Sequence, residues 1–228
     1  MLFNNDSYCA CIWHQRYTGD VLQGLINAPD STVPNPLNQV PVLEFTSPKG
    51  EKLQLTQSVA VIELLDDLYP SEFCPLIPSD VMIKARVKQI AELVTSGIQP
   101  LQSIGILKQV KHVEVGDMKG DGSDYAKLKC REGMDALENL LSALRTPVLQ
   151  QQHGSHESVY SAGTAYPTLA DLCVVPQLYN AKVRLGLTVD ENTHPHVCAV
   201  DAACRELEAF RVAAPDMQPD AVKTVGLL

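Results

Sequence analysis

Two short motifs early in the chain carry groups that could bind a small, peptide-like ligand. Val40 precedes Pro41, and a residue before proline is held extended, so the backbone N–H and C=O of Val40 can pair with a ligand's amide groups. A cis bond between the two residues would sharpen that turn. Gln57 and Ser58 open a predicted amphipathic helix, where a hydroxyl and first-turn amides can hold a carboxylate. The alternative is an edge strand and a capped helix without a ligand.

The elements that must position these motifs change in character along the chain. Residues 1 to about 70 mix short β-like runs with turns, including a strand after Val40, a hairpin at residues 49–51 and a second strand. Prolines punctuate residues 70–78, and helical periodicity dominates from Ser79 onward. The sequence therefore predicts an α/β domain over residues 1–70, a linker, and an all-helical domain over residues 79–228.

Apolar spacing within the second domain predicts its main helices. Residues 80–115 repeat apolar side chains at intervals of three, four and seven, with an interruption expected near Pro100. Residues 125–144 form another amphipathic pattern. Thr168 and Asp171 fit a capping box at the start of an apolar helix. Asp171 is therefore expected to be structural, and a catalytic base is the less favoured interpretation.

Composition and charge restrict the partners. Lys and Arg number 18 against 27 Asp and Glu, which gives a net charge of −9 and disfavours nucleic acid and anionic membranes. No apolar run approaches the roughly 18 residues of a membrane span, and the first residues show no secretory signal pattern. The protein is expected to stay in the cytoplasm. An anionic substrate would need a few local cations.

The cysteines and histidines do not form a metal-binding pattern. Seven cysteines, an odd number, are scattered along the chain, and reduced thiols are the default for such a protein. Cys9 and Cys11 lack the spacing of a zinc knuckle, and the histidine pairs at 153–156 and 194–196 are isolated. No metal is expected.

Several motifs together resemble a known family. The Val-Pro strand and the Gln-Ser pair resemble the glutathione transferases, which bind glutathione with a thioredoxin-like domain. Four further motifs resemble the zeta class of that family, the maleylacetoacetate isomerases. They are Ile-Gln-Pro-Leu-Gln at 98–102, Ile-Leu-Lys-Gln-Val at 106–110, Ala-Asp-Leu-Cys-Val-Val-Pro-Gln at 170–177 and Leu-Glu-Ala-Phe at 207–210. The resemblance implies a thioredoxin-like α/β N-terminal domain followed by an all-α C-terminal domain, the glutathione transferase fold.

The same resemblance implies a cofactor, a reaction and an assembly. Glutathione would be the coenzyme of a cis–trans isomerase that converts maleylacetoacetate to fumarylacetoacetate in tyrosine and phenylalanine catabolism. The steps would be thiolate addition, bond rotation and elimination, and the enzyme would be a homodimer. Two alternatives stay open: a general glutathione transferase acting on small electrophiles or α-halo acids, and a catalytically impaired interaction protein with a transferase-like fold.

The residues that this family uses carry over position by position. The implied glutathione contacts are Val40, Gln57, Ser58 and Gln99, with Ser103 in place of a longer Asn. The family's substrate-binding Arg falls on Val183, so its neighbour Arg184 is the candidate for substrate binding. One residue turns a helical side chain by about 100°, and a solvated surface Arg is the alternative.

The beginning of the chain departs from the family pattern. The family opens with an apolar strand and a Ser-Ser-Cys turn, and the matching stretch here contains Ser7 and Cys9. These two residues are the candidate catalytic turn. The distance to the Val-Pro strand is about a dozen residues shorter than usual, so either the strand and turn are compressed or the first strand and helix are missing.

Overall fold

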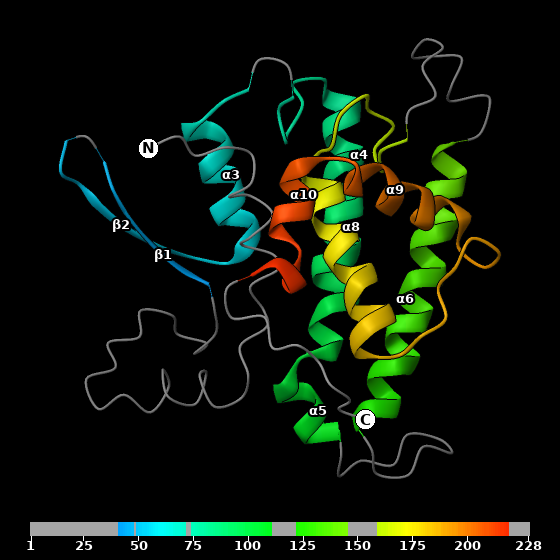
Figure 1. The fold of residues 1–228 in the computed structure, drawn as a ribbon. Helices are drawn as coiled ribbons and strands as arrows, with labels where there is room; N and C mark the ends of the chain where they lie inside the picture. Colours follow the sequence, from blue (N-terminus) through cyan, green and yellow to red (C-terminus); the bar gives the residue numbers. More distant parts are fainter. Residues whose placement is uncertain (1–40, 48, 72–73, 111–121, 146–158, 219–228) are drawn as a thin grey trace. The chain divides into compact units, whose positions relative to one another are not determined.

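The computed structural model describes residues 41–47, 49–71, 74–110, 122–145 and 159–218 (Figure 1). The chain forms two compact units, one of residues 1–72 with 207–228 and one of residues 73–206. Ser7, Cys9 and Val40 lie outside the described residues. The predicted domain limits, 1–70 and 79–228, stay a prediction.

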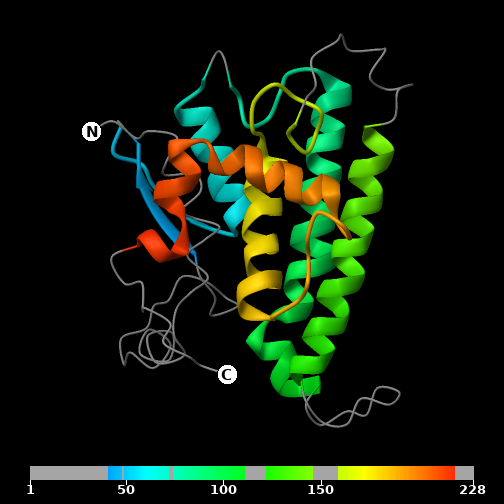
Figure 2. The same cartoon turned by 45° about the vertical axis from the view of Figure 1, so that its right-hand side comes forward.

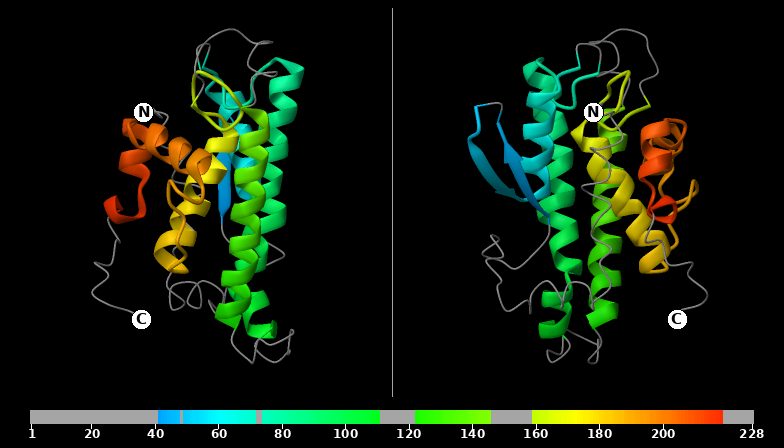
Figure 3. Two further views of the ribbon diagram at one scale, coloured as in Figure 1. Left: turned by 90° about the vertical axis from the view of Figure 1, so that its right-hand side faces the viewer. Right: turned by 60° about the vertical axis from the view of Figure 1, so that its left-hand side comes forward.

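The first unit contains the predicted hairpin. Strand β1 (Val42–Thr46) pairs antiparallel with β2 (Lys52–Thr56), and Val42 lies opposite Thr56. A hydrogen bond from the Ser47 N–H to the Glu51 carbonyl, at 2.8 Å, closes the tight turn between the strands. Gly50 adopts a φ of +82° in this turn. The hairpin is plain in Figure 3. The sequence prediction of two strands around residues 49–51 is thus confirmed.

Helix α3 (Ser58–Leu68) follows β2 after a single residue, Gln57. Its Val61 and Ile62 side chains are buried. Helix α10 (Glu208–Ala213) and the short 3₁₀ turn η4 (Pro215–Met217) belong to the same unit.

The second unit begins with the long helical segment that the sequence predicted, and it is interrupted as expected. It runs through α4 (Val81–Glu92), the π-helical η1 (Leu93–Ile98), the 3₁₀ turn η2 (Gln99–Gln102) and α5 (Ile104–Val110). Asp80 caps the start, because its Oδ1 accepts from the N–H groups of Met82 and Ile83 at 2.9 Å. The change of helix type coincides with Pro100, which has no N–H to continue an α-helical ladder.

Helix α6 (Gly122–Leu144) starts three residues earlier than predicted. Gly122 makes this start possible, because a Cβ there would lie 2.6 Å from the Leu107 carbonyl oxygen. The buried face of α6 consists of Ala126, Cys130, Met134, Leu137 and Leu141. Their spacing of three and four residues matches the amphipathic pattern.

Helix α8 (Leu169–Tyr179) is the buried centre of the second unit and packs against both α4 and α9 (Pro195–Arg205). It continues into the π-helical η3 (Asn180–Arg184). Figure 2 shows α8 beside α4 and α6, with α9 running across their direction. In the part of the chain that the structure describes, no helix is long and apolar enough to cross a membrane.

The capping box at the start of α8 is confirmed. Asp171 Oδ2 accepts from the Thr168 N–H at 2.7 Å, and Oδ1 accepts from the Ser161 N–H at 2.7 Å. Burial raises the pKa of Asp171, and these hydrogen bonds to Ser161 and Thr168 oppose that rise. Because both carboxylate oxygens are engaged in the interior, Asp171 serves the fold.

Candidate functional site

Gln57 joins the hairpin to α3 in an unusual backbone conformation. Its φ of 76° and ψ of 118° make it the sole non-glycine residue with positive φ among those described. Such a conformation is rare for a residue with a side chain and is typically held at functional sites by the structure around it. The turn leaves Gln57 exposed and places Ser58 at the first helical position.

The start of α3 has the chemistry of an anion site. The first N–H groups of a helix have no partner within the helix; no side chain caps this end, and its first turn has no acidic residue. The first helical bond runs from the Val61 N–H to the Gln57 carbonyl at 3.0 Å. Ser58 is half-buried beside these amides. This end of the helix can therefore bind an anionic group such as a carboxylate.

Gln99 and Ser103 lie at the two ends of η2, both half-buried. Ser103 leaves the helical conformation, with φ −68° and ψ 143°. Its Oγ accepts weakly from the Ile106 N–H at 3.5 Å, at the start of α5. The structure therefore brings these two predicted residues together on one short turn, four residues apart.

A buried amide next to them was not assigned a role from the sequence. Gln102 is 5% exposed. Its Nε2 donates to the Ile98 carbonyl at 3.0 Å, and its Oε1 accepts from Asn180 and, at 3.4 Å, from Gln177. The available signal was the presence of Gln102 and Gln177 in two of the class-specific motifs, but sequence alone did not show that they meet.

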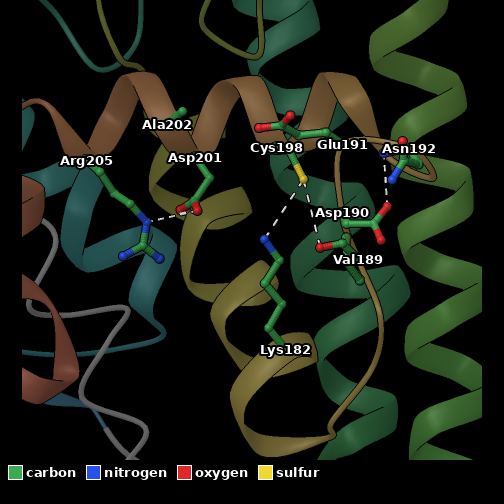
Figure 4. Close-up of a pocket in the computed structure, with 9 residues that line it drawn as sticks. All are labelled: Lys182, Val189, Asp190, Glu191, Asn192, Cys198, Asp201, Ala202 and Arg205. Carbon is green, nitrogen blue, oxygen red and sulfur yellow. Dashed lines mark hydrogen bonds and ion pairs between the residues drawn. The ribbon is translucent and has the colours of Figure 1, made fainter.

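Arg184, the candidate substrate residue, is exposed at the end of η3. The structure does not place it in the open hollow of about 480 Å³ that lies nearby in the second unit. Figure 4 shows the side chains that line this hollow, which are Lys182, Val189, Asp190, Glu191, Asn192, Cys198, Asp201, Ala202 and Arg205. Since none of these is a predicted site residue, the hollow is separate from the candidate glutathione contacts described in this unit.

The hollow carries charges of both signs around a thiol. Cys198 Sγ lies 3.9 Å from Lys182 Nζ. Burial raises the pKa of Cys198, and Lys182 offsets only part of that rise, so the thiol is mostly neutral near pH 7. Arg205 Nε pairs with Asp201 Oδ2 at 2.9 Å.

A second electrostatic feature joins α6 to the start of α9. Glu138 accepts from the backbone N–H groups of His196 and Val197 at 3.1 and 3.0 Å, and from the His196 ring at 2.5 Å. Burial alone would raise the pKa of Glu138, but these hydrogen bonds outweigh it and the pKa is lowered. His194, from the same His-Pro-His motif, contacts Asp135 of α6 at 3.0 Å.

These histidines therefore bind carboxylates of a neighbouring helix. Among the described residues, no group of three or more His, Cys, Asp or Glu side chains could hold a metal ion. The described cysteines, at positions 74, 130, 173, 198 and 204, form no disulfide bonds with one another.

Comparisons with known proteins define the class, which is that of the glutathione transferases. No protein-family profile matches the chain. The chain is 32% identical over 186 residues to the probable maleylacetoacetate isomerase 2 of Drosophila melanogaster, covering 82% of this chain and 69% of that relative. It therefore belongs to the maleylacetoacetate isomerase family, the zeta class of glutathione transferases.

Solved structures agree. A maleylacetoacetate isomerase from Anaeromyxobacter dehalogenans, with bound glutathione in its active site, matches with a TM-score of 0.70 and 32% identity over 96% of this chain and 94% of its own. A bacterial maleylpyruvate isomerase of the zeta class matches with a TM-score of 0.67 and 29% identity over 96% of both chains. The predicted family, the glutathione transferase fold and the class of glutathione-dependent isomerases are thus confirmed.

Proposed function

We propose that this protein is a glutathione-dependent isomerase that converts maleylacetoacetate to fumarylacetoacetate in the cytoplasm. The observation that carries the proposal is the strained Gln57 turn, which opens an uncapped helix at Ser58 in a chain of the maleylacetoacetate isomerase family. Such a strained backbone at Gln57 is expected where a turn must present backbone groups to a ligand.

The proposed role of Ser58 is to hold a carboxylate of glutathione with its hydroxyl and the first-turn amides of α3. Gln57 stands beside it, exposed on the same turn, and is proposed as a second contact. Val40, from the strand that the sequence predicts, is proposed to pair with the peptide backbone of the ligand. Positive helix-end dipoles and N–H donors favour the ionised carboxylate.

Further contacts are proposed from η2, where Gln99 and Ser103 offer an amide and a hydroxyl four residues apart. Ser103 is shorter than the Asn of the family and would reach through a water molecule. Arg184 is proposed to bind a substrate carboxylate, and its exposure leaves the guanidinium available.

Catalysis is proposed to depend on Ser7, with Cys9 as the neighbouring turn residue. When bound, glutathione would supply a thiolate for addition to the cis double bond, rotation about the resulting single bond, and expulsion of the same thiolate. The Ser7 hydroxyl would favour the ionised thiol by donating a hydrogen bond to it. A thiol is a weaker donor than a hydroxyl, so Cys9 contributes less.

The test is an isomerisation assay with and without glutathione, combined with calorimetry. Maleylacetoacetate should isomerise only when glutathione is present, and the glutathione should be recovered unchanged. Ser58→Ala should weaken glutathione binding about tenfold, since a hydrogen bond to a charged group contributes ~1.5–3 kcal/mol. Ser142→Ala, at an exposed position of α6, is the matched control and should leave binding unchanged.

Three results would each overturn part of these assignments. Unchanged affinity in Ser58→Ala removes the role of that residue. Glutathione consumption with small electrophiles or α-halo acids, without isomerisation, replaces the isomerase with a general transferase. If the chain does not bind glutathione at all, it is better regarded as a transferase-like interaction protein.

A homodimer is also proposed, by analogy with the family. Sedimentation at micromolar concentration should give twice the mass of the 228-residue chain. A monomer at that concentration would contradict the assembly without affecting the proposed chemistry.

A further inference from the structure

We propose that Gln102 is a positioning residue for the glutathione contacts on η2. The inference rests on the proposed function, because Gln99 and Ser103 at the two ends of η2 are the residues that it would position. Gln102 itself is buried and does not face the ligand in this proposal.

The backbone around η2 does not maintain its own geometry through a continuous helical ladder. A π-helix ends at Ile98, a 3₁₀ turn follows, and Ser103 is extended. Pro100 donates no backbone hydrogen bond. Short 3₁₀ turns have poorer hydrogen-bond geometry than α-helices, so other contacts must determine how this turn is oriented.

The Gln102 side chain supplies such contacts in both directions. Its Nε2–H donates to the Ile98 carbonyl at 3.0 Å, which links the turn to the end of the π-helix. Its Oε1 accepts from Asn180 of η3 and from Gln177 of α8. One amide therefore ties the turn to two segments that lie about 75 residues further along the chain.

The network continues to a third helix. Gln177, which is 4% exposed, also contacts Cys130 Sγ of α6 through its Nε2 at 3.4 Å. A buried amide that loses its partners costs more than a surface hydrogen bond contributes, so these groups hold one arrangement. This hydrogen-bond network then fixes the orientation of η2, and with it the distance between Gln99 and Ser103 and the direction of their side chains.

The experiment measures glutathione affinity by calorimetry in the full chain, well below the unfolding temperature. Gln102→Met keeps the length of the side chain but removes the donor and the acceptor. It should weaken binding about fivefold or more, because misplaced hydrogen bonds lose ~1 kcal/mol each. Leu141→Ala, at a fully buried site of α6 outside the network, is the control. It should lower Tm and leave affinity unchanged.

Gln102→Glu separates positioning from a merely structural role. The protonated acid can donate to the Ile98 carbonyl and accept from Asn180, whereas the ionised form cannot donate. Its affinity, expressed relative to wild type at each pH, should recover as the pH falls, while Gln102→Met should show no such recovery. A purely structural role would change Tm in both variants without this pH profile of affinity.

Each outcome has a definite meaning. If wild type binds glutathione and Gln102→Met binds equally well, the inference is wrong and the proposed function stands. If wild type does not bind glutathione, the proposed function fails and this inference fails with it. If neither Gln102 variant folds, Asn180→Ala decides: a loss of about threefold supports the inference, and unchanged affinity overturns it.

Discussion

Replacing Gly133 by alanine should destabilise the protein, although alanine is the better helix former. Gly133 lies in α6 against Ile98, and a Cβ there would be 2.6 Å from Ile98 Cγ1 and 2.9 Å from Cδ1 and Cγ2. Ile98 is 1% exposed and β-branched, so its side chain has little freedom to move away. The added methyl therefore forces α6 and η1 apart or drives Ile98 from its rotamer.

The magnitude follows from two opposing effects. Gly→Ala in a helix interior gains ~1 kcal/mol of helix propensity, while overpacking a full interior costs ~1–3 kcal/mol. The net change for Gly133→Ala is therefore a loss of ~0–2 kcal/mol. In Gly105→Ala, in α5, no described atom lies within 4 Å of the new Cβ. This variant should therefore be more stable than wild type, because it gains helix propensity without overpacking. The two variants should differ by ~1–3 kcal/mol and therefore in Tm by roughly 2–12 °C, at ~2–4 °C per kcal/mol.

The assay is thermal unfolding of both variants and of a double-mutant cycle with Ile98→Ala. In the Ile98→Ala background the methyl of Gly133→Ala enters the vacated space, so its effect should change from destabilising to stabilising. If Gly133→Ala is as stabilising as Gly105→Ala, or if the cycle shows no coupling, the close approach of α6 and η1 is not what requires glycine here.

Three further predictions concern stability and reactivity. Glu138→Gln should cost ~1–3 kcal/mol at pH 7, because charged hydrogen bonds at the start of α9 are weakened. Since the pKa of Glu138 is lowered in the fold, its contribution is present above the ordinary value near 4.5 and is lost as the pH falls below it. Unfolding curves at pH 7 and below pH 4 should show that the difference in the free energy of unfolding between wild type and Glu138→Gln becomes smaller at the lower pH. A difference independent of pH would contradict the role given to the ionised Glu138. Asp80→Ala should cost ~0.5–2 kcal/mol by removing the N-cap of α4, with Asp80→Asn near wild type; equal losses in the two variants would argue against capping. Burial raises the pKa of Cys130 to about 11 and of Cys173 to about 12. Both thiols should therefore resist alkylation by iodoacetamide at pH 8 until urea unfolds the chain, which peptide mass mapping can check. Alkylation of either thiol in the native protein would refute their burial.

Much of the fold was predictable from local patterns. Turn residues bounded by β-like runs predicted the hairpin, and apolar spacing predicted α4 and α6. Pro100 predicted the break in the first long helix, and the Thr168–Asp171 spacing predicted the capping box. These features depend on interactions within a few residues, which is why sequence periodicity and capping rules reach them.

The candidate site was predictable only in part. Gln57 and Ser58 were predicted as ligand contacts from their place at the start of an amphipathic helix, and those roles stay predictions. The positive φ of Gln57, at the join between β2 and α3, was not predicted. The start of α6 at Gly122 was missed because its cause is the Leu107 carbonyl, 15 residues earlier in the chain. Ser7, Cys9 and Val40 lie outside the described residues, and their roles stay predictions.

The sequence by itself determined the family, through motifs distributed along the chain, and with it the fold and the class of chemistry. The tertiary structure decided which side chains meet. Gln102, Gln177 and Asn180 are separated by up to 78 residues and form one buried network; Gly133 is a contact surface for Ile98. Such pairings follow from the packing of helices against each other, and hydrophobic periodicity reveals which face of a helix is buried but not which residue lies opposite.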